Sequence, residues 1–136
     1  NEGLGDKVKA SLQEGERTFK SRGFLTWDPK GKIGPAPRIK RGRTFDLGNL
    51  ASFKIDQAFS YGAWIRSARG INGAIFARMD ESRNNRGWDL WQQGGHFGAH
   101  IVDSFPDNAL KIITQKAVLK FGQWNHVFVT IVCLLF

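Results

Sequence analysis

Phe59-Ser-Tyr-Gly-Ala-Trp-Ile-Arg66 is the stretch that decides the fold of this chain. On an extended backbone, alternate side chains share a face, and those on one face here are Phe59, Tyr61, Ala63 and Ile65. Two later stretches have the same aromatic and β-branched character: Gly87-Trp-Asp-Leu-Trp91 and Gly122-Gln-Trp-Asn-His-Val-Phe-Val-Thr130. Such runs, bounded by glycine, Asn and Asp, favour half-buried strands. The sequence therefore predicts an all-β fold, an antiparallel β-sandwich.

Turn residues divide the rest of the chain into about eight predicted strands, at roughly the 8 to 12-residue spacing typical of sandwiches. Gln93-Gly94-Gly95, between the predicted strands 87–92 and 96–103, is the clearest hairpin signal. The length of 136 residues suits one domain, and the 16 glycines suit many short strands joined by tight turns. We expect residues 21–136 to form this domain.

The first twenty residues are polar, and only Val8, Leu12 and Phe19 give a weak helical pattern. We expect residues 1–20 to be a linker or a short helix. At the other end, the final predicted strand continues through the apolar run Val127 to Phe136. We expect the chain to be a fragment of a longer protein, with an incomplete sandwich whose last strand promotes self-association.

The net charge of +8 would attract anionic partners, but much of the excess lies between Lys30 and Arg43. A basic loop or sheet edge explains this segment better than a nucleic-acid or polyanion site does, so nucleic acid is not the expected partner. Cys133 is the only cysteine, which excludes an intrachain disulfide, and its apolar surroundings favour buried packing over catalysis. No apolar run reaches the length of about 18 residues needed for a membrane span.

Several phrases, taken in order, resemble the concanavalin A-like lectin/glucanase superfamily, which includes laminin G-like domains. They are Arg43-Thr-Phe-Asp-Leu-Gly48, Phe59 to Arg66, Gly73 to Arg78 and Gly122 to Thr130. A more specific set is similar to the lectin-like domain of large planctomycete proteins that also carry cytochrome c-like domains: Gly73 to Asp80, Arg86 to Trp91, Gly98-Ala-His-Ile101 and Pro106-Asp-Asn-Ala109. The resemblance covers roughly Arg38 to Thr130.

That resemblance implies a jelly-roll sandwich acting as a recognition module beside other domains of an extracytoplasmic or periplasmic parent protein. A glucanase of the superfamily would carry paired acidic residues in a Glu-x-Asp-x-Glu spacing, so that one carboxylate attacks while its partner is protonated. The chain departs from that pattern: Asp80 and Glu81 are adjacent, whereas Asp103 and Asp107 flank a predicted turn. We therefore expect no enzyme activity and no catalytic residues.

The histidines and acidic residues give no catalytic or metal motif. His96, His100 and His126 lie on separate predicted strands without triad spacing, which is typical of surface or packed histidines. Clustered metal ligands are also missing, so no metal or other cofactor is expected. Calcium alone stays open, because loop oxygens suffice for it. The loop residues that could supply them are Asp80, Asn84, Asp103, Asp107 and Asn108.

Sugar recognition needs exposed aromatic faces with polar groups beside them, and the segment from Arg78 to Gln93 has this mixture. Alternation places Trp88 and Leu90 on one face and Asp89 and Trp91 on the other. If Leu90 marks the core, Trp91 is the more exposed ring. The candidate ligand-binding residues are Arg78, Asp80, Asn84, Arg86, Asp89 and Trp91. We predict a non-catalytic, carbohydrate-binding module; the alternatives are a structural or protein-interaction domain, and polyanion binding through Lys30 to Arg43.

Overall fold

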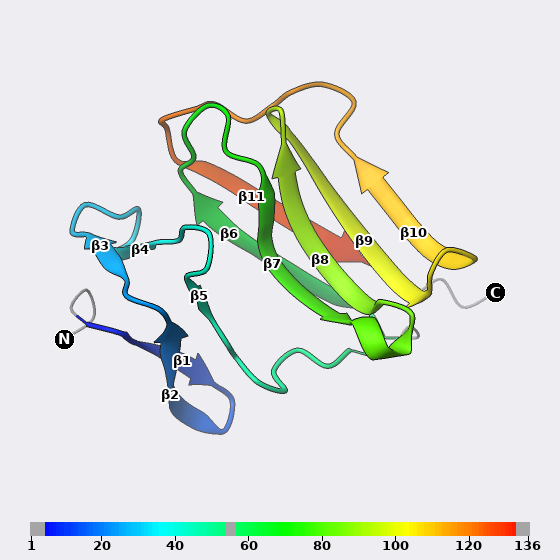
Figure 1. The fold of residues 1–136 in the computed structure, drawn as a ribbon, viewed down its shortest axis with the longest axis horizontal. Helices are drawn as coiled ribbons and strands as arrows, with labels where there is room; N and C mark the ends of the chain where they lie inside the picture. The colour runs from blue at the N-terminus through cyan, green and yellow to red at the C-terminus, as the bar shows by residue number, and fades with distance from the viewer. Residues whose placement is uncertain (1–4, 54–56, 133–136) are drawn as a thin grey trace. The chain divides into compact units, whose positions relative to one another are not determined.

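A computed structural model describes residues 5–53 and 57–132 (Figure 1). Within these ranges the regular structure is eleven β-strands and one short 3₁₀ turn, η1 (Glu81–Arg83). Every paired strand runs antiparallel to its neighbour. The prediction of an all-β fold is confirmed. The chain divides into two compact units between Leu50 and Ala51, whereas the sequence placed the boundary near residue 20.

The first unit consists of short strands. β1 (Lys7–Leu12) and β2 (Gly15–Arg22) form a hairpin, and β5 (Thr44–Phe45) pairs with the other edge of β2. β3 (Thr26–Asp28) and β4 (Ala36–Arg38) form a separate pair. The hairpin lies where the sequence predicts a linker or short helix. Its reason is the period-two alternation of exposed and half-buried residues in β1, together with Gly15, whose φ of 117° suits the tight turn.

The second unit contains two sheets. β7 (Gly73–Asp80), β8 (Arg86–Gln93), β9 (His96–Ser104) and β10 (Asn108–Ile113) form a meander with the strand order β10-β9-β8-β7. β6 (Phe59–Ile65) and β11 (Asn125–Ile131) form a two-stranded sheet across one face of this meander (Figure 1). The predicted hairpin joins β8 to β9, and both Gly94 and Gly95 have the positive φ that such a turn requires.

The core of this unit lies between the two sheets. Leu90 of β8, only 1% exposed, and Phe97 of β9 pack with Val127 of β11 and with Leu119 from the β10–β11 connection. The Tyr61 hydroxyl of β6 donates a hydrogen bond to the Asp89 carbonyl at 2.9 Å and so links the two layers. Burial raises the pKa of Tyr61 to about 12, and the Asp89 carboxylate adds to the rise. This face-to-face packing of antiparallel sheets fits a β-sandwich.

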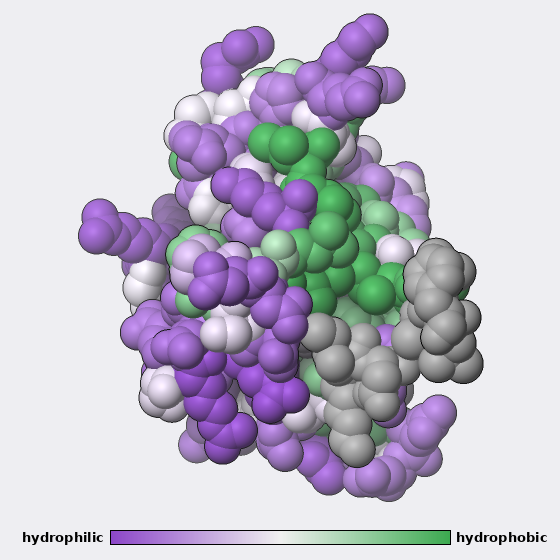
Figure 2. Space-filling view, turned by 90° about the vertical axis from the view of Figure 1, so that its right-hand side faces the viewer, coloured by the Kyte–Doolittle hydropathy of each residue, from purple (hydrophilic) through white to green (hydrophobic). Residues whose placement is uncertain are grey.

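The two-stranded sheet leaves part of the meander uncovered on the β10 and β11 side. Apolar side chains of β9, β10 and β11 line an opening of about 240 Å³ there. Figure 2 shows it as a continuous green area among purple, hydrophilic side chains. Ile113 and Phe128, which border this opening, are 53% and 59% exposed.

Candidate functional site

The six predicted site residues do not converge on one place. Alternation along β8 directs Trp88 and Leu90 toward the two-stranded sheet, and both contact its residues or the core. Asp89 and Trp91 therefore lie on the opposite face of β8, which we call the outer face of the meander. Arg86 belongs to the same side of β8 as Trp88, and the other three predicted residues precede β8. The described structure thus separates Asp89 and Trp91 from Arg78, Asp80, Asn84 and Arg86.

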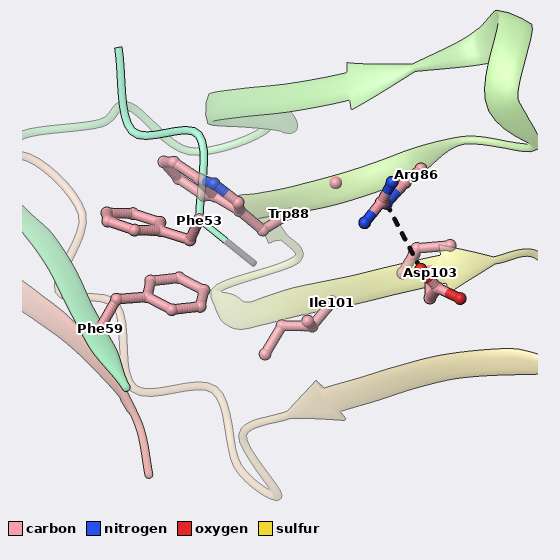
Figure 3. Close-up of a pocket in the computed structure, with 8 residues that line it drawn as sticks. Phe53, Phe59, Arg86, Trp88, Ile101 and Asp103 are labelled. Atoms are coloured by element: carbon pink, nitrogen blue, oxygen red, sulfur yellow. Dashed lines mark ion pairs between the residues drawn. The ribbon is translucent and has the colours of Figure 1, made fainter. Parts of the chain in front are cut away.

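Arg86 borders a small cavity at the end of the two layers (Figure 3). The aromatic rings of Phe53, Phe59 and Trp88 form one side of it, and the Arg86–Asp103 ion pair, with Nε and Oδ1 3.3 Å apart, lies on the other. Its volume of about 40 Å³ can hold a water molecule. Ligand pockets generally measure about 300–1,000 Å³, so this cavity has no room for a sugar ring.

Asp80 and Asn84 shape the turn between β7 and β8. The Asp80 carboxylate accepts hydrogen bonds from the Ser82 hydroxyl at 2.6 Å and the Ser82 amide at 3.1 Å, and these, with the nearby Arg83, lower the pKa of Asp80. Asn84 has the left-handed backbone, with φ of 52°, and its carbonyl accepts from the Phe105 amide at 3.0 Å. Arg78 lies on β7, in register with Trp88. Asp80 and Asn84 thus stabilise the turn between β7 and β8.

No three His, Cys, Asp or Glu side chains in residues 5–53 and 57–132 are grouped so that they could hold a metal ion. The carboxylates of Asp80 and Asp103, two of the loop residues that could supply calcium ligands, are already engaged by Arg83 and Arg86.

The outer face of the meander carries an aromatic surface centred on Trp91. Its ring lies against Gly98, the residue opposite it on β9. A Cβ atom at position 98 would be 2.0 Å from Cζ2 of Trp91, so only glycine allows this position of the ring. The ring of His100 lies beside it, with ring centroids 5.9 Å apart and planes inclined by 27°. Two rings of similar orientation thus lie next to each other.

Asp89 fixes the orientation of His100. One carboxylate oxygen accepts from the His100 backbone amide at 2.8 Å, and the two oxygens lie 3.1 and 3.0 Å from Nδ1 of the imidazole. With the Nδ1 proton directed at the carboxylate, Nε2 is the ring atom left to meet a ligand. Both side chains are partly exposed, 15% for Asp89 and 25% for His100.

The position of the Trp91 indole leaves a buried hydrogen-bond donor unsatisfied. Its Nε1 is buried and has no hydrogen-bond partner among the described residues. Leaving such a donor unsatisfied generally costs about 1–3 kcal/mol. The indole is thus held in place by its neighbours rather than by a hydrogen bond.

Sequence reasoning missed Gly98 and His100 as members of this site, although the signal was present. A two-residue turn at Gly94-Gly95 pairs Gln93 with His96, and counting back along both strands brings Trp91 opposite Gly98. The same count brings position 89 opposite position 100. The predicted hairpin therefore already contained the register that assembles the outer face.

A second aromatic group lies on the outer side of the two-stranded sheet. The rings of Trp64 and His126 have centroids 4.9 Å apart, and Phe128 follows His126 at 6.0 Å. Trp64 and Phe128 are 38% and 59% exposed. No carboxylate lies within salt-bridge distance of His126 in the described structure, so this row differs from the outer face of the meander, where Asp89 orients the imidazole.

The basic segment belongs to the first unit. It includes the β3–β4 connection, β4 and an isolated bridge between Lys40 and Arg43. Arg38 forms an ion pair with the buried Asp28 at 3.3 Å. Loops and a short strand are the setting expected of a basic loop or sheet edge.

Comparisons with models of known protein families, with curated proteins and with solved structures found no match. No helix in the described parts of the chain has the length and apolar character needed to cross a membrane.

Proposed function

We propose that this protein is a non-catalytic recognition module that binds carbohydrate on the outer face of the meander. The observation that carries the proposal is the Trp91 ring held on Gly98 beside His100, with His100 oriented by Asp89. The apolar face of a sugar ring stacks on an indole, and its hydroxyl groups need fixed polar partners at the rim. Trp91 supplies the first requirement, and His100 and Asp89 supply the second.

The proposal extends to the fold and the setting of the module. The jelly-roll arrangement of the concanavalin A-like type is part of the proposal and rests on the sequence resemblance, with which the two packed antiparallel sheets are compatible. A module of this kind would bind its ligand on behalf of other domains of a larger extracytoplasmic protein. Hydrolysis forms no part of the proposal, because Asp89 is engaged with His100 and glycoside hydrolysis needs two carboxylates flanking the scissile bond.

The test is a glycan array followed by calorimetric titration of the best ligand. Trp91→Ala should weaken binding about tenfold or more, equivalent to about 1.4 kcal/mol, because the stacking surface is lost. Trp64→Ala is the matched control: it removes an exposed tryptophan from the other sheet and should leave the affinity unchanged.

Three results would contradict this proposal. A wild-type protein that is folded but binds no glycan at millimolar concentration would refute the function. If Trp64→Ala abolished glycan binding and Trp91→Ala left it unchanged, the site would instead be the row formed by Trp64, His126 and Phe128. Release of reducing ends from the bound glycan would show that the module is catalytic.

The alternative, a protein-interaction domain, is favoured by a different observation, the exposed apolar opening beside β11. This opening belongs to another surface of the same unit.

A further inference from the structure

β11 has one paired edge and one edge with no partner strand in the described structure. All seven of its residues pair with β6, from Asn125 opposite Ile65 to Ile131 opposite Phe59. No other described strand is hydrogen-bonded to β11. An edge of this kind presents a row of backbone N–H and C=O groups to whatever strand can approach it.

The apolar opening lies directly beside this edge. Val127 and Val129 of β11 form one wall, and Phe97, Ile112 and Ile113 of the meander form another. Its volume of about 240 Å³ is enough for several aliphatic side chains, and Ile112, at its border, is 44% exposed. A strand added to β11 would direct alternate side chains into this opening, as in other cases of strand addition.

A second copy of β11 has the sequence that such an added strand requires. Asn125 to Ile131 contains no charged residue and no proline, and Val127, Val129 and Ile131 alternate on the side facing the meander. Two such strands, paired antiparallel about Phe128, bring Val127 of each copy opposite Val129 of the other. His126 then lies opposite Thr130. The segment is therefore complementary to itself, which is what a twofold interface requires.

Charge supports a contact confined to this segment. The chain carries a net charge of +8, which opposes the approach of two copies. None of that charge lies between Asn125 and Ile131, so the pairing itself brings no like charges together. The remaining repulsion is screened by salt, so association should strengthen as ionic strength rises.

We infer that the free edge of β11 and the apolar opening beside it form a twofold interface between two copies of this chain. The two β11 strands pair antiparallel and join the two-stranded sheets of both copies into one continuous sheet. The added strand covers Ile112, which lies opposite the buried Ala99. This surface is distinct from the outer face of the meander, so carbohydrate binding and pairing can be tested separately.

The experiment is sedimentation velocity on the full chain at micromolar concentration, with circular dichroism to establish folding. The wild type should be a dimer whose dissociation constant falls with added salt. Phe128→Lys should raise that constant at least tenfold, because two lysines then meet at the twofold axis. Ile71→Lys is the matched control, since it adds the same charge at a 58% exposed position that does not line the opening, and it should still dimerise.

A mixture of Phe128→Lys and Phe128→Glu distinguishes a blocked interface from a damaged strand. Each variant alone should be monomeric, whereas the mixture should form a heterodimer because opposite charges meet at position 128. A monomeric wild type, a dimeric Phe128→Lys variant, or failure of the mixture to associate would each overturn the inference. So would a monomer that binds an added extended apolar peptide in place of a second copy.

Discussion

Gly98→Ala tests the packing on which the proposed recognition site depends. The added methyl group would lie 2.0 Å from Cζ2 and 2.3 Å from Cε2 of Trp91, far inside contact distance. Both atoms belong to a rigid ring, so the clash can be relieved only by lifting the indole off β9 or by moving the strands apart. The backbone of Gly98 itself is no obstacle, because its φ lies outside the left-handed region that favours glycine.

The magnitude follows from overpacking. Forcing extra volume into a well-packed contact costs about 1–3 kcal/mol in the free energy of unfolding. In a Trp91→Ala background the ring is absent, and the same Gly98→Ala change should instead stabilise by about 0.4–1 kcal/mol, since alanine restricts the unfolded chain. The effect of Gly98→Ala should therefore change sign between the two backgrounds.

The assay is urea unfolding of the wild type, both single variants and the double variant, followed by circular dichroism and analysed as a double-mutant cycle. The same four proteins should be titrated with the glycan, and Gly98→Ala should weaken binding because the indole is displaced. An equal cost of Gly98→Ala with and without the indole would refute the described contact between Trp91 and Gly98.

Two further predictions concern the core behind the site. Leu90→Ala should lower the free energy of unfolding by about 2–5 kcal/mol because it leaves a cavity at a fully buried position. Leu110→Ala, at a 54% exposed position of the same sheet, is the control and should change the free energy of unfolding by less than about 0.5 kcal/mol. If urea unfolding gave similar costs for the two variants, Leu90 would lie outside the core. For Tyr61, the folded pKa of about 12 lies above the unfolded value of about 10, so its own contribution to stability should be constant below pH 10 and should be lost as the pH rises toward 12. Tyr61→Phe should lack this part of the fall, and ultraviolet titration of this single tyrosine should give an apparent pKa well above 10 in the folded protein; a value near 10 would contradict its burial.

The all-β fold could be predicted from local sequence because aromatic and β-branched residues occur in short runs between turn residues. The two faces of β8 could be predicted for the same reason, since alternation fixes them once Leu90 is assigned to the core. The same alternation, extended to Arg86, places it on the face of Trp88, whereas the predicted site grouped it with Trp91 because the two residues are close in sequence. The ion pair between Arg86 and Asp103 depends on the register in which β8 pairs with β9, and the pattern within β8 alone does not give that register.

The hairpin of β1 and β2 was harder to predict because few of its alternating residues are apolar. Val8 lies opposite Phe19, but polar residues such as Lys9 and Thr18 fill the positions between them. The two strands are held together by backbone hydrogen bonds, and these leave no signal in the hydropathy pattern of the sequence. The outer face needed a similar step, because the position of Trp91 depends on a glycine seven residues away across the hairpin.

The hydrogen bond between the Tyr61 hydroxyl and the Asp89 carbonyl has a consequence for the proposed recognition site. Asp89 uses its side chain to hold His100 on the outer face and its carbonyl to hold Tyr61 in the interior. A ligand that immobilises His100 also restrains the peptide group to which the other layer is tethered. If the proposed site binds its ligand, binding and the packing of the two layers should therefore be thermodynamically linked, and the ligand-bound domain should resist mechanical unfolding more than the free one.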